Sequence, residues 1–263
     1  MEDRRMKEYA CISSIVACFL LSVVYVASLY VWNSPHNRDH PSTIKKRFLS
    51  VFIMMFVSPL FLYSFSREGI LKKASIWELL GLRWQGLFPA AVIPLLLTML
   101  LFLGPICMQG FSGLWKLYAE PRYWLANAQN LIWLRNHVVA PLSEEFTFRA
   151  CMLPLLLQCF RPMTAVFVCP LFFGVGFQFA YTTLFGAYSA FLFARTGHFI
   201  APFAAHAFCN HMGFPDFAEL MTYKDHNRIV LMSLFVLGLV LWCVLLTPVT
   251  NPHWYSNNLF WKT

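Results

Sequence analysis

Two adjacent glutamates and an arginine lie at the start of an apolar segment, PLSEEFTFRACMLPLLLQCF, at residues 141–160. Glu145 and Arg149 are spaced i, i+4 with the acid first, so they can form an ion pair on one helix face. Glu144 points about 100° away around the helix. Because a carboxylate withdrawn from bulk water is a better general base, we predict that Glu144 activates water and that Glu145 and Arg149 are structural. The alternative role for Glu144 is a second partner for Arg149.

A histidine and an asparagine form a second polar set, within HFIAPFAAHAFCNHMGFP at residues 198–215. His206 and Asn210 are also spaced i, i+4, which places the imidazole and the carboxamide on one helix face. Both groups can donate a hydrogen bond to an oxygen. Opposite Glu144 they would form an oxyanion site for peptide hydrolysis; a buried histidine satisfied by one neighbour is the structural alternative. His198 and His211 are predicted to be boundary polar residues.

Metal and disulfide chemistry receive little support from the spacing of the ligand residues. Glu144 or Glu145, together with His206 and His211, have the side chains that bind zinc. No H-E-x-x-H motif occurs, however, and these ligands would come from separate helices. The eight cysteines lie in or beside apolar stretches without C-x-x-C spacing. We therefore predict no metal, no other cofactor and buried free thiols.

The elements that position these residues are predicted to be membrane helices. The chain has 59% hydrophobic and only 12% charged residues, whereas soluble domains have roughly 25% charged residues. Several apolar stretches reach the ~20 residues that cross a bilayer. These stretches are residues 11–32, 48–65, 86–108, 140–159, 163–194, 199–214 and 229–249. The prediction is an all-α, polytopic integral membrane bundle of about six or seven spans, in a single domain over residues 1–263.

Two further features bear on the surroundings of the bundle. The net charge of +8 suits contact with anionic membrane lipid, and no aromatic interleaving typical of nucleic-acid binding occurs. Residues 114–141 are rich in tryptophan and tyrosine, which favour the headgroup layer. We predict that this segment lies along the interface or dips into the membrane as a short helix, with the wall of an acyl-lined site as the functional alternative.

Three sequence motifs resemble those of the type II CAAX prenyl endopeptidases, the Ras-converting proteases of the endoplasmic reticulum. They read P-L-S-E-E-F-T-F-R-A-C-M-L-P, F-G-A-Y-S-A-F-L-F-A-R-T-G-H and H-A-F-C-N-H-M-G-F-P, within about residues 138–215. The resemblance implies a multi-pass protease of the endoplasmic reticulum membrane that removes the last three residues from prenylated CAAX proteins, such as Ras-like small GTPases. It implies that Glu144 activates water and that His206 and Asn210 stabilise the oxyanion. The same motif includes Glu145 and Arg149.

One motif of that family is missing. The family carries F-x-x-x-H between these motifs, and its histidine is the partner of the catalytic glutamate. Here the fourth residue after Phe172 or Phe173 is Gly176 or Phe177, and residues 138–197 contain no histidine. The resemblance therefore implies impaired catalysis unless another group replaces the histidine.

The length of the surrounding apolar run indicates where the histidine was lost. Residues 163–194 are 32 positions without a charge, too long for one span and too short for two with a turn. We expect a helix end, its loop and the next helix start to be missing near Val175 and Gly176. The alternative function is a non-catalytic membrane scaffold or transporter that binds prenylated or lipid-like ligands through the same polar residues.

Overall fold

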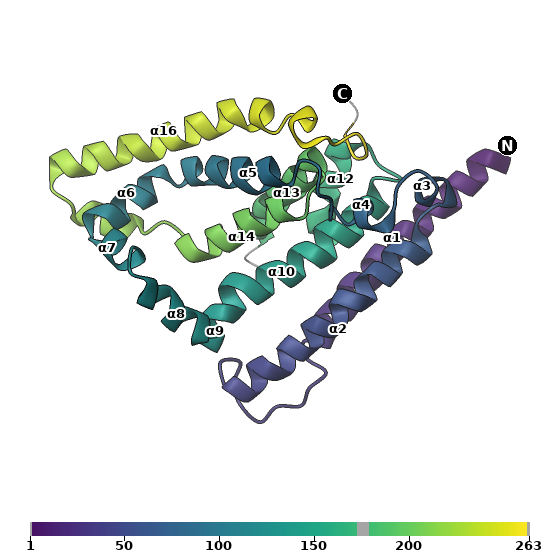
Figure 1. Cartoon of the computed structure of the whole chain (residues 1–263), viewed down its shortest axis with the longest axis horizontal. Coiled ribbons are helices and arrows are strands. Elements are labelled where there is room, and N and C mark those ends of the chain that lie inside the picture. The colour runs from purple at the N-terminus through teal and green to yellow at the C-terminus, as the bar shows by residue number, and fades with distance from the viewer. Residues whose placement is uncertain (1, 173–178, 262–263) are drawn as a thin grey trace.

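A computed structural model describes residues 2–172 and 179–261, and every regular element within these ranges is helical (Figure 1). The all-α prediction is therefore confirmed. In the described part, three helices are long and apolar enough to cross a bilayer, and a pair bent by 72° can form a fourth span. The three are α1 (Glu2–Ser28), α2 (Pro41–Phe65) and α16 (Asp225–Val249), and the bent pair is α5 (Leu87–Leu101) with α6 (Leu103–Phe111). The molecule is a membrane helical bundle, and the number of six or seven spans stays a prediction.

The helix that carries the two glutamates runs through the middle of the bundle (Figure 1). It consists of five segments that follow one another without a gap. These are α9 (Leu131–Leu134), η1 (Arg135–Val139), α10 (Ala140–Glu145), η2 (Phe146–Met152) and α11 (Leu153–Leu156). η1 and η2 are π-helical turns, which are rare and often occur at functional sites. Pro141 and Pro154 lie beside them, and each removes one helical hydrogen-bond donor.

Three helices follow the central helix along the chain. They are α12 (Pro162–Val168) with the 3-10 turn η3 (Cys169–Phe172), then α13 (Phe179–Thr196) and α14 (Ile200–Met212). The long uncharged run at residues 163–194 is thus divided between α12, η3 and α13. The junction expected near Val175 and Gly176 lies outside the described residues.

Short helices connect the longer ones. They are α3 (Glu68–Leu71), α4 (Ile76–Leu79), α7 (Leu114–Tyr118), α8 (Pro121–Gln129), α15 (Phe217–Thr222) and the 3-10 turn η4 (Pro252–Tyr255). α7 and α8 expose Trp115 and Trp124, whose side chains are 53% and 40% accessible. The segment predicted to be helical is therefore helical, whereas its place along the membrane interface stays a prediction.

Two groups of helices enclose the central helix. α1 packs against α2 on one side (Figure 1), and both contact η2 and α11. The main apolar core lies there, and its fully buried members include Leu21, Phe148 and Leu153. On the other side, α14 packs against both α5 and α10, and α5 packs against α16. This arrangement places α14 next to the glutamates of α10.

Close packing of α16 against α5 depends on a glycine. A Cβ atom on Gly238 would lie 2.4 Å from the backbone oxygen of Leu100, so the two helices would have to separate. We expect Gly238→Ala to lower the free energy of unfolding by about 1–3 kcal/mol, measured by thermal or denaturant unfolding in detergent. Gly69→Ala is the control, because a Cβ there meets nothing within 4 Å. Equal effects of the two substitutions would contradict this packing.

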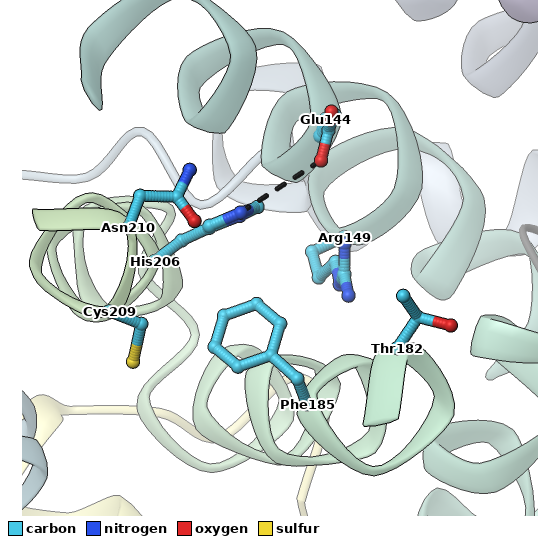
Figure 2. A pocket seen from close by; sticks show the side chains of 7 residues that line it. All are labelled: Glu144, Arg149, Thr182, Phe185, His206, Cys209 and Asn210. Carbon is cyan, nitrogen blue, oxygen red and sulfur yellow. Dashed lines mark ion pairs between the residues drawn. The ribbon is translucent and has the colours of Figure 1, made fainter. Parts of the chain in front are cut away.

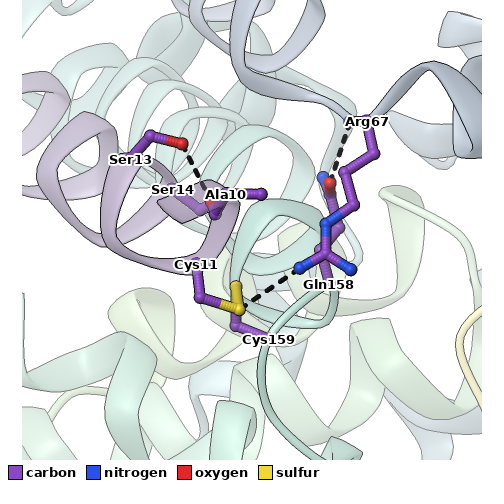
Figure 3. Close-up of a disulfide and its surroundings, with 7 residues drawn as sticks. All are labelled: Ala10, Cys11, Ser13, Ser14, Arg67, Gln158 and Cys159. Atoms are coloured by element: carbon purple, nitrogen blue, oxygen red, sulfur yellow. Dashed lines mark hydrogen bonds between the residues drawn. A yellow bond between two sulfur atoms is a disulfide. The ribbon is translucent and has the colours of Figure 1, made fainter. Parts of the chain in front are cut away.

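Cys11 and Cys159 form a disulfide (Figure 3), so the prediction of free thiols was wrong for this pair. Cys11 lies on α1 and Cys159 just after α11, with 5.2 Å between their Cα atoms. The guanidinium of Arg67 donates to Cys11 Sγ, and the backbone N–H of Arg67 donates to the side-chain oxygen of Gln158. Spacing rules could not reveal the pair, because the cysteines are separated by 148 residues in sequence. The other six cysteines are free.

Candidate active site

The central helix and α14 supply the two polar sets that the sequence predicts, and they face each other (Figure 2). Glu144, Glu145 and Arg149 lie on α10 and η2, whereas His206 and Asn210 lie on α14. α13 forms a third wall. The structure therefore brings all five predicted site residues into one region of the bundle.

Glu145 and Arg149 form the ion pair that their i, i+4 spacing allows. Arg149 Nη1 lies 3.2 Å from Glu145 Oε1, and the side chains are 8% and 0% exposed. Ser189 of α13 also donates a hydrogen bond to Glu145, through its hydroxyl to Oε2. Together with His206, these residues give the buried carboxylate three partners, which hold it in one orientation. Ser189 was missed by the sequence analysis because a single serine on an apolar helix carries no distinctive signal.

His206 connects the two glutamates. Its Nδ1 atom lies 2.7 Å from Glu145 Oε1, and its Nε2 atom lies 3.9 Å from Glu144 Oε2 (Figure 2). Because Glu145 is a carboxylate already paired with Arg149, Nδ1 is the donor in the shorter contact. The ring is thereby fixed with Nε2 toward Glu144. The sequence analysis placed His206 opposite Glu144 but did not foresee its bond to Glu145.

A cavity of about 160 Å³ separates these side chains. Its lining residues are Glu144, Arg149, Thr182, Phe185, His206, Cys209 and Asn210 (Figure 2). A water molecule needs at least about 10–15 Å³ of such space, so the cavity can admit water together with a peptide group. With 3.9 Å between Glu144 Oε2 and His206 Nε2, one water can hydrogen-bond to both atoms.

Asn210 lies at the edge of this cavity. Its Nδ2 atom donates to the backbone oxygen of Asn136 at 2.8 Å, which ties the end of α14 to η1. One amide hydrogen remains for another acceptor. The predicted oxyanion role of Asn210 stays a prediction, and the observed bond adds a positioning role.

Metal ligands are not gathered at this site. Among the described residues, no group of three or more His, Cys, Asp or Glu side chains is arranged to hold a metal ion. His198 takes no part in the cavity, since its ring is buried and Nε2 lies 2.9 Å from the backbone oxygen of Gln85. The placement of Glu144 and His206 at the cavity supports acid–base chemistry with water.

Comparison with known proteins decides the family. The human CAAX prenyl protease 2 is 43% identical over 278 positions, which cover 94% of this chain and 84% of the human protein.

This chain belongs to the type II CAAX prenyl endopeptidase family.

The rat and Arabidopsis thaliana proteins of the same name are 42% and 32% identical. The rat alignment covers 94% of this chain and 83% of that protein, and the Arabidopsis alignment covers 93% and 92%. The family model described as type II CAAX prenyl endopeptidase Rce1-like matches residues 126–212, which include all five predicted site residues. No solved structure matches this chain.

The human alignment has 278 positions, of which about 247 are residues of this chain, so about thirty positions have no residue here. The rat alignment has 257 positions over the same share of this chain and leaves only about ten. The segment expected to be missing between the family motifs therefore stays a prediction.

Proposed function

We propose that this chain is an intramembrane endopeptidase that removes the C-terminal aaX tripeptide from prenylated CAAX proteins. The observation that carries the proposal is the placement of Glu144 opposite Nε2 of His206, 3.9 Å apart, in a small cavity inside the bundle. The names of the relatives support the substrate class, since each is a CAAX prenyl protease. The five-residue motif set is present, and only the F-x-x-x-H histidine is missing from the sequence.

The geometry supports hydrolysis by activated water. Glu144 takes a proton from water, and the water oxygen bonds to the scissile carbonyl carbon. Donors at His206 Nε2 and Asn210 Nδ2 face the oxyanion that forms; the histidine donates from Nε2 when its ring carries both protons. The C–N bond then breaks, and Glu144 returns the proton to the leaving amine. The products are a prenylcysteine carboxylic acid and a tripeptide.

We infer that His206, besides facing the oxyanion, also acts as the partner of Glu144 that the absent histidine is in the family, because its imidazole lies beside Glu144 in the described structure. We infer that this chain keeps glutamate-dependent cleavage at a reduced rate. We also place it in the endoplasmic reticulum membrane with Ras-like small GTPases among its substrates, in line with the family resemblance. Fluorescence microscopy of a tagged chain against an endoplasmic reticulum marker tests the location.

Release of the tripeptide from a farnesylated CAAX peptide tests the proposed function. The chain is placed in membranes without endogenous activity, and the products are followed by mass spectrometry. We expect cleavage of the farnesylated peptide and none of the same peptide without its prenyl group. A second chain, carrying the human relative's segment inserted at the junction near Val175 and Gly176, should cleave faster. Binding without cleavage by both chains would instead favour the scaffold function.

Ser189 provides a further prediction, because its hydroxyl holds the carboxylate that orients His206. Ser189→Ala leaves a buried carboxylate oxygen without its donor, and we expect kcat for tripeptide release to fall about tenfold with KM unchanged. Ser233→Ala is the control, because that hydroxyl bonds to the Ile229 backbone oxygen on α16, away from the cavity. A fall in KM for Ser189→Ala, or an equal loss of kcat in Ser189→Ala and Ser233→Ala, would argue against a positioning role.

A further inference from the structure

Six aromatic rings gather where α14 ends, beyond the catalytic cavity. They belong to Tyr118 of α7, Tyr123 and Trp124 of α8, Trp133 of α9, His137 of η1 and His211 of α14. We call these residues the aromatic cluster. Neighbouring rings have centroid distances between 4.7 and 6.5 Å. The mechanism uses none of them, and the sequence analysis missed His137.

Two histidines form the polar part of the aromatic cluster. The rings of His137 and His211 are 5.7 Å apart at an angle of 64°, and both side chains are half-buried. Trp133 stacks on His137 at 4.7 Å, and Trp124 covers His211 at 5.7 Å. His137 Nδ1 lies 2.9 Å from the backbone oxygen of Trp133 and therefore donates to it, so Nε2 can donate to an anionic ligand when the ring carries both protons. The packed rings thus present imidazole nitrogens in a fixed position.

The chemistry of this pair fits a small anion. Imidazole N–H groups make strong hydrogen bonds with carboxylates, more so when the ring is protonated. Arg135, two residues before His137, does not compete for such an anion, since its guanidinium is bound to Asp39 at 2.9 Å. A carboxylate beside the two rings would accept a hydrogen bond from an N–H of His211 and, when the His137 ring carries both protons, from His137 Nε2.

The distance from the aromatic cluster to the cavity can be taken along the two helices that carry both. His137 precedes Glu144 by seven residues on the central helix, which is about 10 Å of helix. His211 follows His206 by five residues on α14, or about 8 Å, and the Asn210–Asn136 bond joins the two helices beside the aromatic cluster. Three extended residues span about 10 Å. The aromatic cluster is therefore about one tripeptide away from the water between Glu144 and His206.

We propose that His137 and His211 bind the C-terminal carboxylate of the substrate while its scissile carbonyl lies beside the water held by Glu144 and His206. This inference rests on the proposed function and explains how the length of the released peptide is set. An anchored carboxylate about 10 Å from the attacking water selects the bond three residues from the end of the chain, so a tripeptide is released. The prenyl chain extends to the opposite side of the cleavage point.

The test compares two fluorescent farnesylated CAAX peptides that differ only at the C-terminus, one with a carboxylate and one with a carboxamide. Their dissociation constants are measured with the full chain in lipid nanodiscs, and every chain also carries Glu144→Gln to prevent cleavage. We expect the carboxylate peptide to bind at least about tenfold more tightly. His137→Phe and His211→Phe keep a ring but remove its nitrogens, and each should reduce the preference to within about twofold. His36→Phe is the matched control, because that ring stacks on another histidine, His40, in the α1–α2 loop.

Each outcome decides a different question. Carboxamide binding that is unchanged in His137→Phe and His211→Phe shows that these variants are folded, so a lost preference for the carboxylate supports the inference. The inference is overturned if both variants still prefer the carboxylate peptide, or if the chain with His137 and His211 intact shows no such preference. Neither result contradicts the proposed function. Failure of the chain that carries Glu144→Gln alone to bind either peptide overturns the proposed function together with the inference.

Discussion

Glu144→Gln is expected to lower the rate of tripeptide release by at least about 100-fold while binding of the farnesylated peptide stays within about twofold. The carboxamide fills the space of the carboxylate but cannot accept a proton from water. Binding is retained because Glu144 lies 3.9 Å from Nε2 of His206 and has no closer ion-pair partner in the described structure. Rates are measured with saturating peptide, and affinities by fluorescence.

The control for this substitution is Glu68→Gln, which also removes one carboxylate. Glu68 lies on α3, and its side chain is 89% exposed, so its loss should leave the rate unchanged. Equal activity of Glu144→Gln and the parent chain would show that another group takes the proton. Loss of peptide binding in Glu144→Gln would show that this carboxylate recognises the substrate.

The second large effect is expected on stability. Glu145→Gln should lower the free energy of unfolding by about 3–5 kcal/mol, because it leaves the buried Arg149 guanidinium and His206 Nδ1 without their carboxylate. Unfolding in detergent, followed by circular dichroism against denaturant, measures the change. Adding Arg149→Met to Glu145→Gln should recover part of the loss, since the unpaired buried charge is then removed.

An exposed pair with the same spacing provides the comparison for Glu145. Glu68 and Lys72 are also i, i+4 with the acid first, at 3.7 Å, but their side chains are 89% and 78% exposed. Glu68→Gln should therefore change the free energy of unfolding by no more than about 1 kcal/mol. Similar losses for Glu145→Gln and Glu68→Gln would mean that the Glu145–Arg149 pair is not buried in the protein as it folds in the membrane.

Local spacing predicted the parts of the site that lie on one helix. The Glu145–Arg149 pair follows from i, i+4 geometry, and the shared face of His206 and Asn210 follows from the same rule. Composition was enough for the all-α membrane class, because so apolar a chain cannot be covered by polar surface. These inferences need no knowledge of which helices are neighbours.

Contacts between helices were not predictable in this way. The hydrogen bonds of Glu145 with His206 and Ser189 join α10 to α14 and α13, and the bond of Asn210 to Asn136 joins α14 to η1. Each depends on helix packing, which single-chain periodicity does not encode. The disulfide was missed for the same reason, since its two cysteines come from distant segments. The sequence analysis singled out the aromatic residues of 114–141, but the contact of that segment with His211 of α14 was not predictable.

The number of spans was harder to predict than the helical class. The central helix carries Glu144, Glu145 and Arg149, and the π-helical turns divide it into short segments. None of these segments is long enough to be recognised by itself as a membrane span, although the central helix runs through the core. A count from apolar stretches alone treats such a helix and the largely exposed α16 alike.

The claim that Glu144 activates water for cleavage of a prenylated CAAX peptide is tested most directly by one single-turnover reaction in ¹⁸O-labelled water. The full chain in excess is mixed with farnesylated CAAX peptide, and the new prenylcysteine carboxylate is analysed by mass spectrometry. We predict one ¹⁸O atom in that carboxylate from the first turnover, and no product with Glu144→Gln. Unlabelled product in the first turnover would show that a side-chain oxygen attacks instead. No product from this chain, where the chain with the inserted human segment gives labelled product, would contradict catalysis by Glu144 and His206 alone.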